Sequence, residues 1–202
     1  MIKRIKYIKD ERLKFISHLD TMRVFARAMR RGRICVAYSR GFNPHPVMSF
    51  VMPLSLSFVS ECEFADIDFD CEVPDGVLIG KFNAALPDGL RVVSVSPPVM
   101  KAAAITAAEY DIETDGNISS FFEQSSFVVN KKSKKGFKDV DIMPYIYSYK
   151  ICGNTVTLKL AAGNEMNLNP EVVMAGAQKF YDKDLTYNIC RRKIFAGEEE
   201  FC

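Results

Sequence analysis

Residues 17–50 read SHLDTMRVFARAMRRGRICVAYSRGFNPHPVMSF and carry a helix signal followed by two strand signals. Ser17 is a typical helix N-cap, and Asp20 stands at the third helical position, where a carboxylate satisfies free backbone N–H groups. Apolar side chains then recur at helical spacing, at Leu19, Met22, Phe25, Ala26 and Met29. Gly32 stands where a helix C-cap is expected. The pattern predicts an amphipathic helix over residues 18–31.

The same kind of pattern can be followed through the first 98 residues. Strands are expected at 2–9, 34–38, 48–56, 61–72 and 90–95, and helices at 18–31 and 74–86. Apart from one additional short strand, this is the order β-α-β-β-α-β, with an internal hairpin, of the ferredoxin-like arrangement. We therefore expect a first ferredoxin-like domain over residues 1–98.

A similar order begins again after an alanine-rich linker. Strands are expected at 109–114, 127–129, 145–151, 155–160 and 186–195, and helices at 118–124 and 170–180. Gly153-Asn154 is a strong hairpin turn signal, and Asn169 followed by Pro170 is a typical helix start. The prediction is an α+β fold with two ferredoxin-like (βαββαβ) halves in tandem, the second over residues 107–202. The repeat is visible in element order only.

Composition excludes several classes of protein. No run of about 18 apolar residues exists, and the N-terminus lacks the order of a secretion signal, so we expect a cytoplasmic protein with no membrane contact. The six cysteines include no C-x-x-C pair, and no three of them are closely spaced enough for a radical-SAM iron-sulfur cluster. We expect mostly buried, reduced thiols, and no cofactor or metal site is predicted.

Charge is strongly segregated along the chain. Residues 1–40 carry a net charge of +9, residues 41–125 carry −10, and residues 126–202 carry +3. Such asymmetry is typical of a basic surface for an anionic partner. It is also what two faces that attract each other within the fold would give.

The two histidines, His18 and His45, are the candidates for acid–base chemistry near neutral pH. If the first helix and the proline-containing loop converge, both would join Ser17, Asp20 and Asn43 in one polar cluster. Alternatively, His18 only fills the first helical turn and His45 satisfies backbone groups in a rigid loop. Two histidines and one aspartate match no metal-binding signature.

Basic residues form two further candidate surfaces for phosphate. Guanidinium groups match phosphate oxygens and stay charged. The arginine candidates are Arg23, Arg27, Arg30, Arg31 and Arg40, and the lysine candidates are Lys131, Lys132, Lys134 and Lys135, with Lys138 beside them. Together they predict an electrostatic track for an RNA backbone, although an arginine face can also be only a solvated face.

Two further rows of side chains have a functional and a structural interpretation. Tyr145, Tyr147 and Tyr149 alternate and could stack on bases, but packing on the sheet is favoured. Asp66, Asp68, Asp70 and Glu72 are expected on one face of the 61–72 strand, too far apart to chelate a metal as neighbours. The acidic row instead suggests a solvated edge or a docking surface.

Three stretches, LKFISHLDTMRVFARAMRRGRI (13–34), AYSRGFNPHPVMSF (37–50) and PLSLSFVSECEFADIDF (53–69), resemble the radical-SAM-linked protein family. AAEYDIE (107–113) and KDVDIMPYI (138–146) extend the resemblance. This bacterial domain occurs as a separate chain or fused behind a radical-SAM module. The resemblance places these residues at motif positions: Ser17, His18, Asp20, Arg23, Arg30 and the GFNPHP loop 41–46. Ser57 departs from it, because a glycine is expected there.

The resemblance implies a radical-SAM enzyme as partner, one that modifies RNA or a translation component. The leading hypothesis is an accessory binding protein that presents RNA or another anionic substrate to that enzyme. A second hypothesis is a metal-independent ribonuclease with His18 and His45 as acid and base. A third is a protein-interaction module that docks through the acidic strand 61–72.

Overall fold

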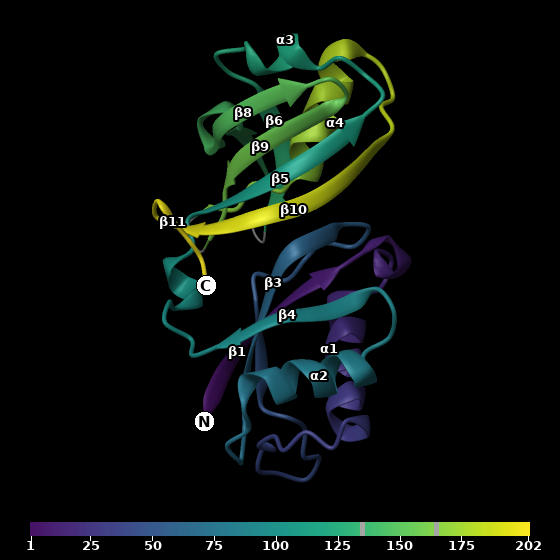
Figure 1. The fold of residues 1–202 in the computed structure, drawn as a ribbon. Helices are drawn as coiled ribbons and strands as arrows, with labels where there is room; N and C mark the ends of the chain where they lie inside the picture. Colours follow the sequence, from purple (N-terminus) through teal and green to yellow (C-terminus); the bar gives the residue numbers. More distant parts are fainter. Residues whose placement is uncertain (134–135, 164–165) are drawn as a thin grey trace. The chain divides into compact units, whose positions relative to one another are not determined.

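The computed structural model describes residues 1–133, 136–163 and 166–202 (Figure 1). These residues form a mixed α/β fold of mostly antiparallel strands with four α-helices. The chain divides into two compact units: Met1–Ala102 with Cys202, and Ala103–Phe201. In the described residues no helix is long and apolar enough to cross a bilayer.

Unit 1 is an antiparallel sheet in the order β4-β1-β3-β2, with two helices packed on one face (Figure 1). Its strands are β1 (Ile2–Lys9), β2 (Met48–Val51), β3 (Val59–Asp68) and β4 (Leu90–Ser96). Its helices are α1 (His18–Arg31), α2 (Asp75–Ala85) and the short 3-10 helix η1 (Glu11–Leu13). β1 pairs antiparallel with both β3 and β4, and β2 pairs antiparallel with β3.

The core of unit 1 lies between the helices and the odd-numbered side chains of β1 and β3. Ile5 and Tyr7 of β1, and Ala65 and Ile67 of β3, are all buried there. Phe25 of α1 packs edge-on against Tyr7, with ring centroids 4.9 Å apart. The period-2 pattern of the strands and the 3.6-residue pattern of the helix thus meet in one apolar layer.

The predicted helix 18–31 is confirmed. The Ser17 hydroxyl accepts a hydrogen bond from the Asp20 N–H at 3.1 Å, and Gly32 is the C-cap. The buried face is rotated from the expected one, because Thr21 and Ala28 are buried and Leu19 is exposed.

The predicted strand 34–38 is wrong, and two neighbouring strands are shorter than expected. Residues 34–38 make only isolated bridges, Val36 with Phe69 and Tyr38 with Pro46. The Val47 N–H donates to the Ala37 carbonyl and the Ser39 N–H donates to the His45 carbonyl on either side of the second bridge, but these bonds do not extend into a strand. β2 stops at Val51 because Met52 adopts a left-handed backbone conformation (φ 47°). β3 stops at Asp68.

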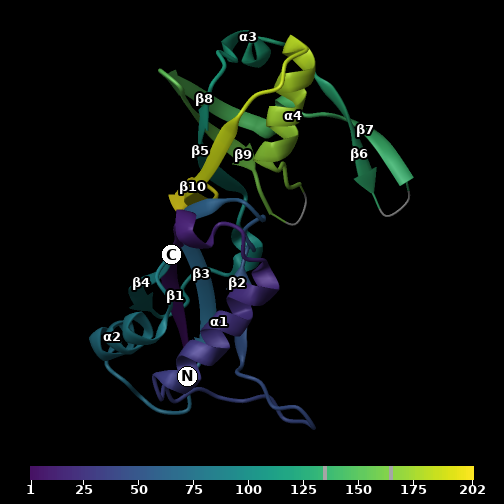
Figure 2. The ribbon, with the colours of Figure 1, turned by 90° about the vertical axis from the view of Figure 1, so that its right-hand side faces the viewer.

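The main strands of unit 2 pair antiparallel in the order β10-β5-β9-β8. Its strands are β5 (Ala107–Thr114), β8 (Ile146–Cys152), β9 (Thr155–Ala161) and β10 (Tyr187–Ala196), with β11 (Glu199–Glu200) on β10. The helices are α3 (Ser119–Phe122), α4 (Pro170–Tyr181), and the 3-10 turns η2 (Ala102–Ala104) and η3 (Met143–Tyr145). A separate hairpin is formed by β6 (Val128–Ser133) and β7 (Gly136–Asp141) (Figure 2).

Two predictions for unit 2, a turn and a helix cap, are confirmed, and one pair of strands was not predicted in full. Gly153 adopts φ 58° in the tight turn between β8 and β9. The Asn169 side chain caps α4 by accepting a hydrogen bond from the Glu171 N–H at 2.9 Å. The β6–β7 hairpin was not predicted, because only a short strand at 127–129 was expected there.

The expectation of mostly buried thiols is wrong. Only Cys62 is buried, whereas Cys35, Cys71, Cys152 and Cys202 are exposed. These four lie at turns or at the ends of elements, where a small side chain has no core to enter.

Ser57 has the backbone conformation that favours glycine. Its φ is 66°, and its N–H donates to the Lys14 carbonyl at 2.9 Å, a bond that glycine would keep. The departure from the expected glycine therefore costs the fold some stability.

We expect Ser57→Gly to raise the free energy of unfolding by up to about 1 kcal/mol, since it removes the left-handed strain. Ser94→Gly, at an exposed position of β4, is the control and should lower stability by about 0.5–1 kcal/mol. Urea unfolding of both variants beside the parent measures this. Loss of stability in Ser57→Gly would contradict the strain assignment.

Candidate functional site

The N-terminal end of α1 holds three of the predicted site residues together. The Ser17 hydroxyl donates to one carboxylate oxygen of Asp20 at 2.6 Å, and Arg23 donates to the other at 2.9 Å. The Ser17 and Arg23 hydrogen bonds lower the pKa of Asp20. Asp20 is therefore an ionised capping group, which suits it to fixing the helix start and not to proton transfer.

His18 is the first residue of α1 and lies partly buried against Phe50 of β2. The two rings are 5.4 Å apart between centroids and nearly perpendicular. Burial lowers the pKa of His18, and the Glu63 carboxylate partly opposes this by raising it. A neutral imidazole at a helix N-terminus is also what the helix dipole favours.

Two buried charged residues beneath this end of α1 were missed from the sequence. Lys9 of β1 and Glu63 of β3 are 4% and 2% exposed. The Lys9 ammonium donates to the carbonyls of Lys14 and Ile16 at 3.2 Å each. Burial lowers the pKa of Lys9, and Glu63 raises it.

These two charges position the chain that leads into α1. The carbonyls bound by Lys9 belong to the residues just before the Ser17 cap, so Lys9 fixes the approach to the helix. The signal for both residues was present in the sequence: Lys9 follows Ile5 and Tyr7 with period 2, and Glu63 precedes Ala65 and Ile67 in the same way.

His45 is held in a separate, locally bonded loop. Ser39 Oγ and His45 Nδ1 hydrogen bond at 2.9 Å, and the His45 N–H donates to Ser39 Oγ at 3.1 Å. The Ser39 N–H donates to the His45 carbonyl at 2.8 Å. The 39–46 loop is thus closed on itself, and Asn43 and His45 are exposed in it.

The structure does not bring His18 and His45 together. The connection between α1 and β2, which contains His45, extends beyond the C-terminal end of α1 (Figure 2). His18 contacts Phe50 instead, and five residues of extended chain separate Phe50 from His45, about 16 Å. The predicted cluster of Ser17, His18, Asp20, Asn43 and His45 is therefore two groups, one at each end of α1.

Arginines line the solvent side of α1. Arg23, Arg27 and Arg30 are exposed at helical positions i, i+4 and i+7, and therefore lie on one face. Arg31 donates to the Ala85 carbonyl at 2.6 Å, and Arg33 and Arg40 are exposed beyond the helix. Within the described residues, Arg27, Arg30, Arg33 and Arg40 have no carboxylate at ion-pair distance.

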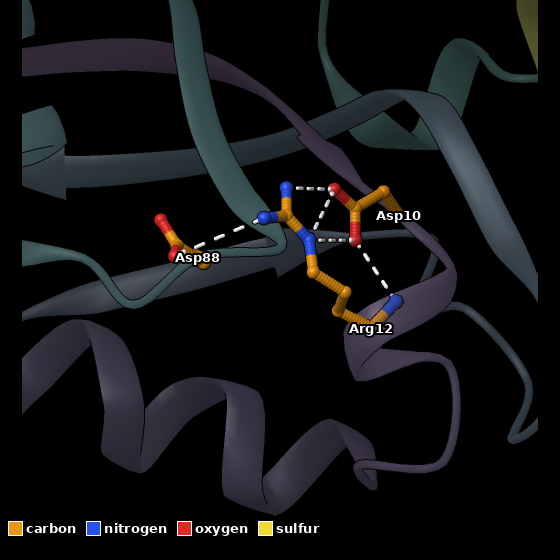
Figure 3. A network of polar contacts seen from close by, with 3 residues as sticks. All are labelled: Asp10, Arg12 and Asp88. Carbon is orange, nitrogen blue, oxygen red and sulfur yellow. Dashed lines mark hydrogen bonds and ion pairs between the residues drawn. The ribbon is translucent and has the colours of Figure 1, made fainter.

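Two arginines elsewhere in unit 1, Arg4 and Arg12, are neutralised by nearby acids. Figure 3 shows the Arg12 guanidinium between Asp10 and Asp88, at 2.6 and 3.8 Å. Arg4, 2% exposed, forms a bidentate pair with Asp66 at 2.7 and 2.8 Å. Arg27, Arg30, Arg33 and Arg40 differ from these two in having no such counter-charge among the described residues, a property that they share with the exposed Arg91 of β4.

The sequence contains a signal for this surface that is hidden when net charge is summed over residues 1–40 and 41–125. Residues 21–60 include six arginines but no lysine, aspartate or glutamate. All six arginines lie between Arg23 and Arg40, and residues 41–60 add no acidic residue to them.

The predicted lysine surface lies in unit 2. Lys131 and Lys132 belong to β6, and the backbone register of the hairpin pairs Lys131 with Lys138 of β7. Lys134 and Lys135 lie outside the described residues. The prediction that lysines and arginines bind one RNA stays a prediction.

The acidic and tyrosine rows differ from expectation. Only Asp66 and Asp68 of the acidic row lie in β3, and Asp68 pairs with the N-terminal ammonium at 2.7 Å. Asp70 and Glu72 follow the strand. In unit 2, Tyr149 stacks on Phe122 at 4.8 Å, and Tyr145 precedes β8, so the tyrosines do not form one exposed row.

Comparison with known families assigns the chain to a bacterial protein family. The model of DUF2344, described as an uncharacterized protein conserved in bacteria, matches residues 3–170. The chain belongs to this family. No curated protein matches it. The DUF2344 match covers α1, the 39–46 loop and the β6–β7 hairpin, and its description names no substrate or reaction.

In this DUF2344 chain we expect the His18 pKa to lie below its value in the urea-unfolded chain, because burial disfavours the imidazolium. The unfolded chain then binds the proton more tightly, so His18 lowers stability as pH falls through and below its ordinary pKa. Proton NMR of the two histidines measures both states, and His45→Gln assigns the signals.

Glu63→Gln is the companion variant. The Glu63 carboxylate raises the His18 pKa, so its neutralisation should lower that pKa further. A His18 pKa that rises in Glu63→Gln, or one that is equal in the folded and unfolded chains, would contradict the assignment.

Proposed function

We propose that this DUF2344 chain binds RNA through the arginine surface of α1 and presents it to a radical-SAM enzyme. The observation that carries the proposal is the exposed set Arg27, Arg30, Arg33 and Arg40, which has no carboxylate partner among the described residues. An exposed cation without an internal counter-charge is free to pair with phosphate, and no ion pair must be broken first.

The choice of arginine supports RNA over a simple solvated face. A solvated helix face usually mixes lysine, arginine and acids, whereas residues 21–60 hold arginine alone among the four charged types. Arginine matches phosphate oxygens in a bidentate way and also stacks on bases. His18, Asn43 and His45 then position the target from the two ends of α1.

The family resemblance supports the proposed radical-SAM partner, and the spacing of the cysteines is compatible with it. The chain has no three closely spaced cysteines, so we place the cluster on a separate enzyme or module. This DUF2344 chain would then supply substrate binding, and the partner the chemistry.

We further propose that each unit is a ferredoxin-like half. The strand order β4-β1-β3-β2 in unit 1 has its counterpart in β10-β5-β9-β8 of unit 2. In each, a helix precedes the last strand, as in the βαββαβ pattern. In unit 2 the short α3 and the β6–β7 hairpin occupy the place of the first long helix.

Neither rival hypothesis gains a supporting observation. A ribonuclease needs both imidazoles at one phosphate, but His18 and His45 belong to opposite ends of α1. An acidic docking strand needs free carboxylates, but Asp66 and Asp68 pair with Arg4 and the N-terminal ammonium.

Reversing two arginines tests the proposal. Arg27→Glu with Arg30→Glu should weaken binding to total cellular RNA by roughly tenfold or more, and should reduce the salt slope by about 0.7 for each phosphate that is no longer neutralised. Arg23 is left intact because it also holds Asp20 at the helix cap. Electrophoretic mobility shifts across a salt series measure both quantities.

The matched control reverses the same number of charges elsewhere in unit 1. Arg91→Glu with Lys101→Glu changes two exposed residues outside α1 and should leave most of the affinity. Circular dichroism checks the fold of each variant. Absent or salt-insensitive binding by the parent, or equal losses of affinity in both double variants, would refute the arginine surface.

A further inference from the structure

Phe42 is the most exposed large apolar residue of unit 1. Its side chain is 103% exposed, compared with 71% for Phe15 and 43% for Tyr38. An aromatic ring that folding leaves wholly in water contributes nothing to the core. Phe42 therefore has no role in the packing of unit 1.

The loop that carries Phe42 is held in shape. The hydrogen bonds between Ser39 and His45 close its base, and the bridge between Tyr38 and Pro46 continues the closure. Pro44 and Pro46 restrict the backbone of the returning half. Phe42 is thus presented on a closed loop, so less conformational freedom is lost when it binds a partner.

Glycine allows the turn at the tip of this loop. Gly41 adopts φ 149°, a value that side chains with a Cβ rarely take, although a Cβ there would meet no atom within 4 Å. The need at position 41 is one of backbone conformation and not of space. This turn sets the direction in which Phe42 leaves the chain.

The loop around Phe42 exposes a cation and an amide, and also two apolar side chains, Tyr38 and Val47, near its base. Arg40 and Asn43 are exposed beside it, and the loop continues the segment 21–60, which lacks acidic residues. An aromatic ring beside arginine is the combination by which proteins hold single-stranded nucleic acid.

We propose that Phe42 stacks on an unpaired nucleobase of the RNA while Arg40 binds a neighbouring phosphate. The inference rests on the proposed function and narrows its substrate class to RNA with single-stranded loops or ends. In a duplex both faces of each base are covered by stacking, so Phe42 has no face to contact.

A single tryptophan tests the stacking directly. The chain contains no tryptophan, so Phe42→Trp introduces one fluorophore at the loop tip. With a short single-stranded RNA of about 12 nucleotides, within the site size of one binding module, its emission should be quenched at the RNA concentrations that give the mobility shift. The same strand in a perfect duplex should quench it much less. Phe15→Trp, exposed before the N-terminal end of α1, is the matched control and should be quenched little.

Two further variants separate stacking from mere apolar contact. Phe42→Ala should weaken binding to the single strand by about fivefold or more, as loss of one base stack does. Phe42→Leu keeps apolar bulk but lacks the aromatic face, and should behave like Phe42→Ala. Binding to the duplex should change little in either.

Failure of this inference can be told from failure of the proposed function. If the parent binds RNA through Arg27 and Arg30 but Phe42→Trp is not quenched and Phe42→Ala binds normally, the stacking is refuted and the arginine surface stands. If the parent binds no RNA, both fall. If Phe42→Ala binds RNA normally but loses a radical-SAM protein that co-purifies with the parent, Phe42 is a protein anchor and the stacking is wrong.

Discussion

The direction of α1 is set by the two strands that it connects. β1 and β2 both pair antiparallel with β3, so they run parallel to each other and the chain must return between them. α1 makes that return, and its N-terminal end therefore lies near the end of β2. This is why His18 contacts Phe50 and not the residues that precede β2. The loop before β2 is correspondingly placed at the other end of the helix, together with Arg33 and Arg40.

This constraint separates two chemistries along one helix. At the N-terminal end the polar groups are mutually satisfied: Asp20 binds Ser17 and Arg23, and Lys9 binds two backbone carbonyls. Removing one member of such a set leaves a buried or capping group without its partner. At the C-terminal end the cations face solvent and the aromatic ring of Phe42 is exposed. The polar groups of the first end are used to hold the fold, whereas those of the second end face solvent.

The sequence was most informative where a short local rule governs the structure. The Ser17 cap, the Gly153 turn and the Asn169 cap each depend on residues within a few positions, and all three are present as expected. The predictions that were wrong depend on contacts between segments that are far apart in the sequence. Residues 34–38 have strand-like side chains, but their partners lie beyond the end of β3 and in a proline loop, so no ladder forms.

The sequence indicated individual residues of the candidate site better than it indicated how those residues lie relative to one another. Ser17 and Asp20 lie together because one helical turn joins them, whereas the meeting of His18 with His45 would have required the opposite direction for α1. The burial of Lys9 and Glu63 depends on a pairing between β1 and β3 that spans more than 50 residues. Period 2 placed both side chains on the core face, but a lysine and a glutamate are ordinarily assigned to the surface.

Helix electrostatics accounts for some of the arginines on α1 without any ligand. Arg30 and Arg31 stand in the last turn, where cations interact favourably with the negative end of the helix dipole, and Arg23 pairs with Asp20. Arg27 has neither benefit, because it lies in the middle of the helix and the dipole effect fades within about one turn. Exposed charges of like sign are screened over roughly 8–10 Å at physiological salt, so Arg27 costs the fold little. Its position on the same face as Arg23 and Arg30 is the one that the proposed contact with RNA phosphates requires, and none of the contacts described for unit 1 involves its guanidinium.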